Sequence, residues 1–302
     1  MSDKQVIAVV GATGAQGGGL VRAIAADKSG RYVARAITRD KSSDKAKALA
    51  ALGAEVVSAD VDDEASVRRA FEGCYGAYCV TFFWAHFSAD KEIAEAGAMA
   101  RAAKAAGVKH VIWSTLEDTR RFVPLSDNRM PTLHGKYKVP HYDGKGEANQ
   151  MFVDVGVPTY FGVGPKKGPD GVLTLTLPMG DKKLPGIAAE DIGKCAFGVF
   201  KRPELIDKSV WVAGDHVTGA DMAKQLGDAL GKEIRYFSPP FEVYRGFGFP
   251  GADDLGNMFQ FKHDFNEYYV GARDLSFARA LNPELQDYKT WVAANKHKIP
   301  LE

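Results

Sequence analysis

The 302-residue chain has little cysteine, no long apolar run and no excess of charge of either sign. Its three cysteines, Cys74, Cys79 and Cys195, are odd in number, which predicts reduced thiols rather than a disulfide framework. No apolar run reaches the ~18 residues that span a bilayer, and Met1 to Lys4 lead straight into apolar sequence without a signal-peptide core. We therefore expect no membrane contact and a cytoplasmic protein, with the nucleus as a second compartment.

The charge balance and several missing motifs narrow the function further. With 39 basic and 38 acidic residues the net charge is +1, so no general field attracts nucleic acid, and we expect no direct nucleic-acid binding. The chain contains no His-Glu-x-x-His, Cys-x-x-Cys, Gly-x-Ser-x-Gly or Walker-type Gly-Lys-Ser/Thr sequence. Metal-dependent hydrolysis, thiol exchange, esterase and NTPase functions therefore lack their residues, and we predict no metal site.

A glycine-rich turn near the start of the chain is its most informative feature. The apolar run of residues 6–10 is followed by Gly11, Gly14 and Gly17, and then by a helical pattern. Glycine allows positive φ and close approach to a phosphate, while the following helix offers unpaired N–H groups and a positive dipole end. A glycine loop that closes a β-hairpin is the alternative. We predict a pyrophosphate site of a dinucleotide, made by Gly11, Ala12, Thr13, Gly14, Ala15, Gln16 and Gly17.

The end of the second expected strand, residues 31–38, indicates which dinucleotide binds. An NAD-selective site places an acidic residue there, about 20 residues after the glycine turn. This chain has Thr38 and Arg39, with Lys41 close behind. A guanidinium binds a 2′-phosphate through paired hydrogen bonds, whereas a carboxylate would repel it. The pattern therefore favours NADP(H) over NAD(H); the alternative is that these are ordinary solvated loop charges.

The first half of the chain alternates strand and helix patterns, which predicts an α/β fold. Strands are expected at 6–10, 31–38, 54–57, 76–81 and 109–114, with helices at 42–52, 64–71 and 88–106. Short β–α connections require parallel pairing, so we predict a Rossmann-type doubly wound parallel sheet and a smaller C-terminal α/β lobe. Residues 1–160 would form the NADP-binding domain, its sheet completed by parts of 185–215, and 161–302 the lobe over the cleft.

Within the second half we expect strands at 172–177, 209–212 and 233–237, and a helix from Thr218 to Leu230.

The ligand of such a sheet lies across the carboxyl ends of its strands. We therefore expect Asp60 to accept a hydrogen bond from the adenine amine and Val61 to pack on the ring. Thr81, Phe82 and Phe83 would line the ribose and nicotinamide. The alternative for the aromatic residues is a hydrophobic plug beneath a loop, and for Trp84 this is the favoured interpretation.

Four segments together resemble the NmrA-like family, an atypical branch of the short-chain dehydrogenase/reductase superfamily. They are residues 11–17, Thr38-Arg39, residues 141–147 and residues 248–259. The likeness covers almost the whole chain and is greatest to the animal NmrA-like redox sensor proteins. It implies an extended Rossmann domain, NADP(H) binding with Lys145 on the cofactor ribose, and regulation through protein partners that responds to NADPH/NADP+ balance. It also implies that residues 159–171 are shorter than in the family, which leaves the substrate side of the nicotinamide more open or under a glycine-rich loop.

The proton-transfer residues of short-chain dehydrogenases are incomplete in this chain. Those enzymes place a Tyr four residues before a Lys on one helix, so that the ammonium lowers the pKa of the phenol. None of the eleven tyrosines has Lys four positions later; His141 precedes Lys145 by four and Tyr142 by three. We therefore assign no catalytic residue.

Two functions follow. The first is an NADP(H)-binding redox sensor that acts through protein partners, a homodimer among them. The second is an NADPH-dependent reductase of quinones or other small carbonyl substrates, with Tyr142, His141 or water as proton donor.

Overall fold

The computed structural model describes residues 4–152, 155–156, 165–167, 171–299 and 301. Its main sheet has six strands in the order β3-β2-β1-β4-β5-β6, and every neighbouring pair is parallel. The strands are β1 (Gln5–Val9), β2 (Tyr32–Thr38), β3 (Glu55–Ser58), β4 (Gly76–Cys79), β5 (His110–Thr115) and β6 (Val155–Gly156). This is the predicted doubly wound parallel sheet.

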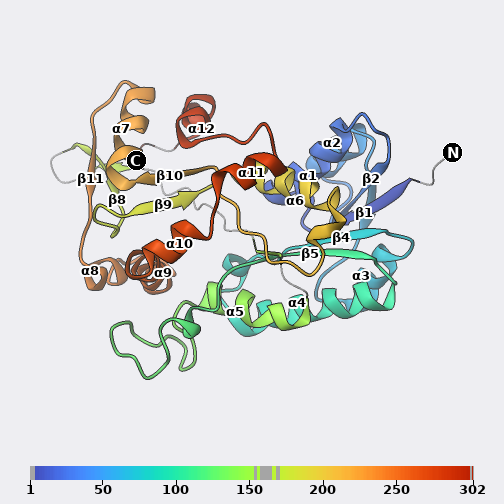
Figure 1. The fold of residues 1–302 in the computed structure, drawn as a ribbon, viewed down its shortest axis with the longest axis horizontal. Helices are drawn as coiled ribbons and strands as arrows, with labels where there is room; N and C mark the ends of the chain where they lie inside the picture. Colours follow the sequence, from blue (N-terminus) through green and yellow to red (C-terminus); the bar gives the residue numbers. More distant parts are fainter. Residues whose placement is uncertain (1–3, 153–154, 157–164, 168–170, 300, 302) are drawn as a thin grey trace.

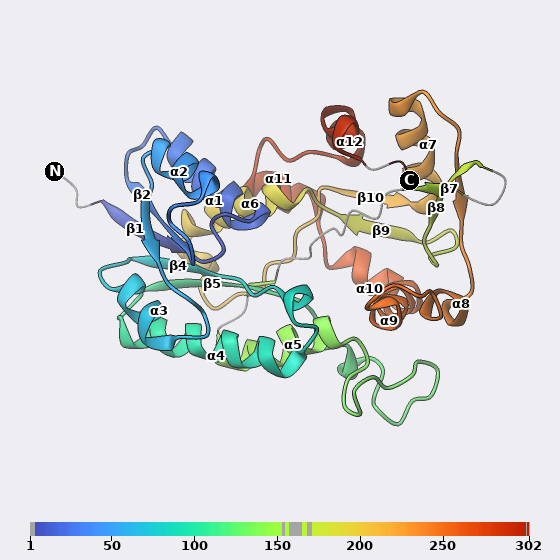
Figure 2. The ribbon, with the colours of Figure 1, turned by 180° about the vertical axis from the view of Figure 1, so that it is seen from behind.

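Helices cover both faces of this sheet (Figures 1 and 2). On one face lie α1 (Ala15–Ala26), α2 (Asp44–Ala51) and α6 (Ala189–Phe200), and on the other α3 (Glu64–Phe71), α4 (Ala89–Ala105) and α5 (Pro140–Ala148). Strand β1 serves both faces, because Ile7 and Val9 belong to the core beneath α1 and α6, whereas Ala8 and Val10 belong to the core beneath α3 and α4.

The local sequence explains where several helices begin. The side chains of Ser43, Asp63 and Ser88 accept hydrogen bonds from backbone N–H groups in the first turns of α2, α3 and α4. Thr218 and Asp221 form a reciprocal capping box at the start of α7 (Gly219–Leu230), the predicted helix start. Five short 3-10 turns complete the helical elements of the described residues, at 83–85, 119–121, 149–151, 203–205 and 296–298.

A smaller α/β lobe lies beside the main sheet (Figure 1). Its strands form a three-stranded sheet, β11-β8-β7, and a two-stranded antiparallel sheet, β10-β9. They are β7 (Lys166–Lys167), β8 (Leu173–Thr176), β9 (Lys183–Gly186), β10 (Asp215–Thr218) and β11 (Ile234–Phe237). Its remaining helices are α8 (Phe241–Arg245), α9 (Ala252–Asp264), α10 (Asn266–Gly271) and α12 (Tyr288–Asn295). Its core also takes in Val139 and Tyr142 at the start of α5, so the two parts share packing.

The prediction that parts of 185–215 complete the main sheet is wrong. Residues 183–186 pair with β10 in the small lobe, and residues 209–212 form no strand, although Val210 and Val212 are buried against the core of α1 and α6. These residues are apolar because they are buried as extended chain, and this burial needs no pairing with a strand. The same segment instead contributes α6, which packs along α1, and α11 (Leu275–Leu281) packs on α6. Two helices that were predicted to lie in the small lobe therefore belong to the half that contains β1.

Two predictions fall on undescribed residues. The expected boundary at 160 and most of the segment 159–171 lie outside the described residues. Among the helices that are described, none is both long and apolar enough to cross a bilayer.

Candidate functional site

The glycine turn connects β1 to α1 as its spacing requires. Gly11 has φ +64°, in the left-handed region, and a Cβ at Gly17 would lie 2.5 Å from the Gly11 carbonyl oxygen. Gly14 is the N-cap of α1 and, as a glycine, makes no side-chain capping bond to the first turn. The three glycines therefore permit the tight turn, add no side chains of their own to its surface and let the helix start close to the strand. These are the requirements for holding an anion at a helix N-terminus.

The other residues of the turn differ in exposure. Ala12 is fully buried in the core, whereas Ala15 is exposed and Thr13 is partly buried. Gln16 reaches across the sheet: its Oε1 accepts hydrogen bonds from the Tyr78 hydroxyl at 2.6 Å and the Ser114 hydroxyl at 3.0 Å. These bonds fix the first turn of α1 to β4 and β5.

Beside this turn, α1 and α6 approach so closely at Gly19 and Gly193 that neither position has room for a side chain. A Cβ at Gly19 would collide with the Glu190 carbonyl group, and one at Gly193 with the backbone N of Leu20. The position of α1 therefore depends on a helix that comes more than 160 residues later in the chain.

The predicted 2′-phosphate residues lie at the end of β2. Arg39 and Lys41 are exposed, and the Arg39 side chain makes no hydrogen bond or ion pair with any described residue. The neighbouring carboxylate of Asp40 accepts hydrogen bonds from the Ser42 hydroxyl at 2.6 Å and the Ser42 N–H at 2.8 Å, which lower its pKa. Asp40, the acid next to Arg39 in the sequence, is thus bound within a local turn. In the same turn, Thr38 Oγ1 accepts a hydrogen bond from the Asp40 N–H at 3.3 Å.

Asp60 and Val61 lie just beyond β3 and are both partly buried. Asp60 Oδ1 accepts a hydrogen bond from the Asp62 N–H at 3.1 Å, and the backbone of Asp60 is bound through Ser66. The sequence-predicted residues of the first three strands thus gather at the carboxyl ends of β1, β2 and β3. Their role as cofactor ligands stays a prediction.

Lys145 occupies the other end of the same edge. Its Nζ donates a hydrogen bond to Thr81 Oγ1 at 2.6 Å and forms an ion pair with Glu92 Oε1 at 3.0 Å. The Thr81 hydroxyl in turn donates to the same Glu92 oxygen at 2.6 Å, and the ammonium lies 5.0 Å from the centre of the Trp113 ring. A lysine on α5 is therefore held at the end of β4 by a threonine of that strand's loop and an acid of α4.

The two side chains that could replace the missing tyrosine are both engaged elsewhere. His141 Nδ1 lies 2.7 Å from Asp254 Oδ1 of α9, and its ring packs on Trp84. The Tyr142 hydroxyl lies 3.0 Å from the hydroxyl of Tyr269 in the core of the small lobe, and burial raises its pKa well above the ordinary value. A deeply buried phenol with a raised pKa is a poor proton donor to a cofactor cleft.

The predicted aromatic lining divides into two. Phe82 is 65% exposed at the end of β4, whereas Phe83 is 3% exposed and packs with Ala89, Tyr137 and Trp84. The expectation that Phe83 lines the nicotinamide therefore needs correction, because packing takes up its ring. Trp84 packs in the same cluster, in line with its interpretation as a hydrophobic plug.

Sequence reasoning missed Glu92, the ion partner of Lys145. Its side chain is fully buried although it belongs to an alanine-rich helix with a polar surface. Ser88 and Glu92 are one turn apart at the start of α4, and no periodicity separates this acid from the exposed Asp90 beside it. Only the tertiary contact with α5 reveals it.

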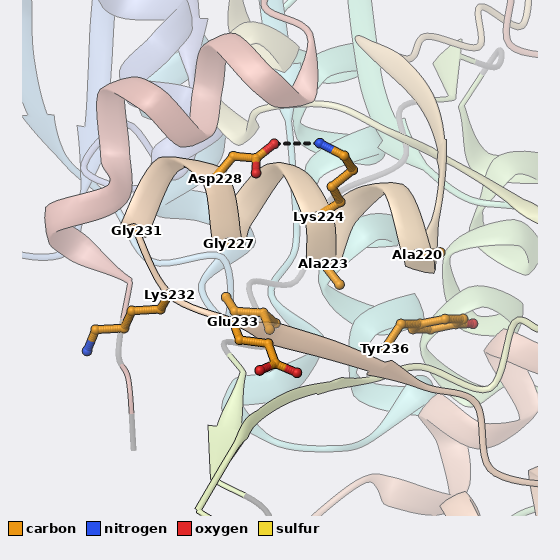
Figure 3. Close-up of a pocket in the computed structure, with 10 residues that line it drawn as sticks. Ala220, Ala223, Lys224, Gly227, Asp228, Gly231, Lys232, Glu233 and Tyr236 are labelled. Atoms are coloured by element: carbon orange, nitrogen blue, oxygen red, sulfur yellow. Dashed lines mark hydrogen bonds and ion pairs between the residues drawn. The ribbon is translucent and has the colours of Figure 1, made fainter.

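A separate open hollow of about 650 Å³ lies on the small lobe between α7 and β11 (Figure 3). Its lining includes Lys224, which is paired with Asp228 at 2.7 Å, and the ring of Tyr236. None of the predicted site residues lines it.

The whole-chain comparison decides the family. The model of the NmrA-like family matches residues 3–292. The chain belongs to the NmrA-like family. The resemblance carried by residues 11–17, 38–39, 141–147 and 248–259 is thereby confirmed.

Individual relatives extend this result. The NmrA-like family domain-containing oxidoreductase FrzB of Cladobotryum sp is 29% identical over 282 residues, which cover 85% of this chain and 83% of that protein. NmrA, a negative transcriptional regulator solved in complex with NAD, has 22% identity and a TM-score of 0.76 over 96% of this chain and 94% of its own. The NADPH-dependent quinone oxidoreductase QOR2 of Escherichia coli, solved with NADPH, has 20% identity and a TM-score of 0.66, covering 96% and 98%. The solved structures support the fold.

Proposed function

We propose that this chain binds NADP(H) across the carboxyl ends of β1 to β5 and acts as a redox-responsive regulatory protein through protein partners. The glycine turn would hold the pyrophosphate, Arg39 and Lys41 the 2′-phosphate, and Lys145 the hydroxyls of the nicotinamide ribose. The related structures solved with NAD or NADPH support the cofactor class. A bound nicotinamide would supply hydride chemistry; these residues bind and orient it.

The observation that carries the regulatory role is the contrast within α5. Lys145 faces Thr81 and Glu92 at the cofactor edge, whereas Tyr142, the nearest phenol along the helix, is bonded to Tyr269 in the small lobe. The proposed binding residues are thus present, and α5 places no phenol beside them to give a proton. Because α5 contacts both the proposed cofactor edge and α9, a change in the nicotinamide could reach the small lobe through a single helix.

A reductase is the second candidate, and one feature favours it. The ring of Phe82 is 65% exposed beside Thr81 and offers a flat apolar surface to an aromatic acceptor. Hydride transfer to a quinone leaves a charge that is delocalised over its oxygens, and water can supply the proton that follows. Such a reaction needs no tyrosine, and the curated relatives named oxidoreductases fit this function as well.

Turnover separates the two candidates. NADPH consumption is measured with a panel of quinones and aldehydes, using the wild-type protein and a Lys145→Ala variant whose fold is checked by circular dichroism. The regulatory proposal expects NADPH binding by calorimetry and no turnover that depends on Lys145. Robust Lys145-dependent turnover would overturn it in favour of the reductase.

A second measurement tests the regulatory role directly. Hydrogen exchange of the small lobe is compared between the NADPH-bound and NADP+-bound protein. The proposal expects different protection in α9, because that helix contacts α5. Identical exchange throughout the lobe would remove the basis for a redox-responsive change.

A further inference from the structure

Two acidic residues of α4 are buried near Lys145: Glu92, which holds the lysine, and Glu95, which has no role in the site described above. Glu92 is fully buried, and its Oε1 binds both Lys145 and Thr81. Its second oxygen, Oε2, is buried and has no hydrogen-bond partner among the described residues. Glu95 follows three residues later, so that it is a neighbour of Glu92 on the helix surface, and is 8% exposed. We call Glu92 and Glu95 the acid pair.

Glu95 has a weakly compensated environment. Its Oε1 lies 3.7 Å from His86 Nε2 and 3.9 Å from Lys91 Nζ, both longer than hydrogen bonds. Desolvation raises the pKa of the Glu95 carboxyl to about 7; Asp62 and Glu92 act in the same direction, and Lys91 and Lys145 oppose them. The charged groups that act on it thus come from α4, from α5 and from the loop after β3. His86, just after the 3-10 turn at 83–85, is a titratable neighbour whose own pKa is lowered by burial.

These groups run from the cleft toward the surface. The exposed side-chain fraction is 12% at Lys145, 0% at Glu92, 9% at Glu95 and 43% at Lys91, which pairs with Asp62 at 3.0 Å. Titratable groups therefore join the predicted cofactor edge to solvent through α4. No described tyrosine of α5 offers such a route, because Tyr142 faces the small lobe.

We propose that the acid pair couples cofactor binding at Lys145 to proton uptake from solvent on α4. This rests on the proposed NADP(H) site. Glu92 is the positioning residue of Lys145, and Glu95 is the group that takes up the proton.

Electrostatics fixes the direction of the exchange. The ribose hydroxyls would draw Lys145 from Glu92 and so weaken the ion pair of that carboxylate with the one cation that binds it among the described residues. The cofactor also brings negative charge. Both changes disfavour the ionised carboxylate of Glu95, so Glu95 takes up a proton on binding, and cofactor affinity falls as pH rises through neutrality.

Calorimetry measures this uptake directly. NADP+ is titrated into the full-length protein at pH 7 in buffers of different ionisation enthalpy, and the wild-type protein is compared with Glu95→Gln. Since protons exchanged by the cofactor phosphate are common to both proteins, the difference reports Glu95. If binding raises its pKa by one unit, the wild-type protein takes up about 0.4 proton more than the variant, and loses about fivefold more affinity between pH 6 and pH 8.

A matched control is Glu72→Gln, at an exposed acid just after α3, which is expected to behave as the wild-type protein. Equal proton uptake by wild type and Glu95→Gln overturns the inference while leaving the NADP(H) site intact. Absence of NADP+ binding by the wild-type protein overturns the proposed function and this inference with it.

A second readout covers failure of Glu95→Gln to fold. The infrared carbonyl band of protonated carboxyl groups is then followed in the wild-type protein at pH 7. It is expected to grow when NADP+ is added, and an unchanged band contradicts the proposal.

Discussion

The two ends of the candidate site are built in different ways. At the proposed pyrophosphate end, backbone groups of residues 11–17 would bind the ligand. The three glycines that allow this turn lie within seven positions of the sequence. At the Lys145 end, the lysine is held by Thr81 and Glu92, which precede it by 64 and 53 positions. One end is a local turn and the other is a tertiary assembly of three elements.

The difference has an energetic side. The glycine turn contains no charged side chain, so a substitution there would act through steric conflict with the backbone. The Lys145 end depends on a buried ion pair, whose partners stabilise the fold only while both are present. The first end should therefore fail by losing ligand affinity, and the second by losing stability.

Lys145→Met is the strongest test of this contrast. It leaves the Glu92 carboxylate buried without its cation, so we expect the free energy of unfolding to fall by about 3 kcal/mol. Glu92→Gln added to Lys145→Met removes the uncompensated charge and should recover most of the loss. Chemical denaturation of both variants measures this, and an unchanged midpoint for Lys145→Met would show that the ion pair does not stabilise the fold.

Gly17→Ala tests the other end. A methyl group there would stand 2.5 Å from the Gly11 carbonyl oxygen, so the start of α1 must move away from β1. We expect about 100-fold weaker NADPH binding by calorimetry, or about 2.7 kcal/mol. The control is Gly271→Ala, where an added Cβ meets nothing within 4 Å. Wild-type affinity in Gly17→Ala would contradict a pyrophosphate site at this turn.

Arg39→Ala addresses the choice of dinucleotide. Loss of a guanidinium on the 2′-phosphate is expected to weaken NADPH binding about 30-fold and leave NADH binding unchanged. Lys45→Ala, at an exposed lysine of α2, is the matched control. If NADH binds wild type as tightly as NADPH and Arg39→Ala changes neither, the preference for NADP(H) is withdrawn.

Glu95→Gln gives the smallest effect, and it depends on pH. Because the pKa of Glu95 is raised from 4.5 to about 7, the folded protein binds more protons than the unfolded chain between these values. Stability from this group is therefore present below pH 4.5 and lost as pH rises toward 7. At pH 8 the variant should be more stable than the wild-type protein in thermal unfolding, and at pH 4 this advantage should vanish.

The sequence could predict the local features of the site and not the tertiary ones. The turn at 11–17 was predictable because positive φ and close packing demand glycine at fixed spacing. Glu92 was not, because its burial depends on α5 lying across α4. Phe83 was misplaced for a similar reason: two adjacent aromatic residues look alike in sequence, and only the packing of Ala89 and Tyr137 decides which ring is covered.

The second half of the chain shows the same limit. The strands at 172–177 and 233–237 and the helix from Thr218 were predictable from alternation and capping, and the structure has them as β8, β11 and α7. Residues 209–212 have an equally apolar pattern, yet they lie against α1 and α6 without forming a strand. An apolar sequence pattern predicts that a segment is buried. It does not predict which strand, if any, pairs with that segment, because the pairing depends on the tertiary fold.

The contact of Gly19 with Glu190 and of Gly193 with Leu20 bears on how the protein could be divided. A fragment that ends at residue 160 would keep every residue of the glycine turn but expose Leu20 and Val21, which α6 helps to bury. The nucleotide-binding half is therefore not expected to fold as a separate fragment. Its first helix, α1, is fully packed only once α6, which begins at residue 189, has been synthesised. During translation, the glycine turn can therefore reach its final packing only after the second half of the chain has been made.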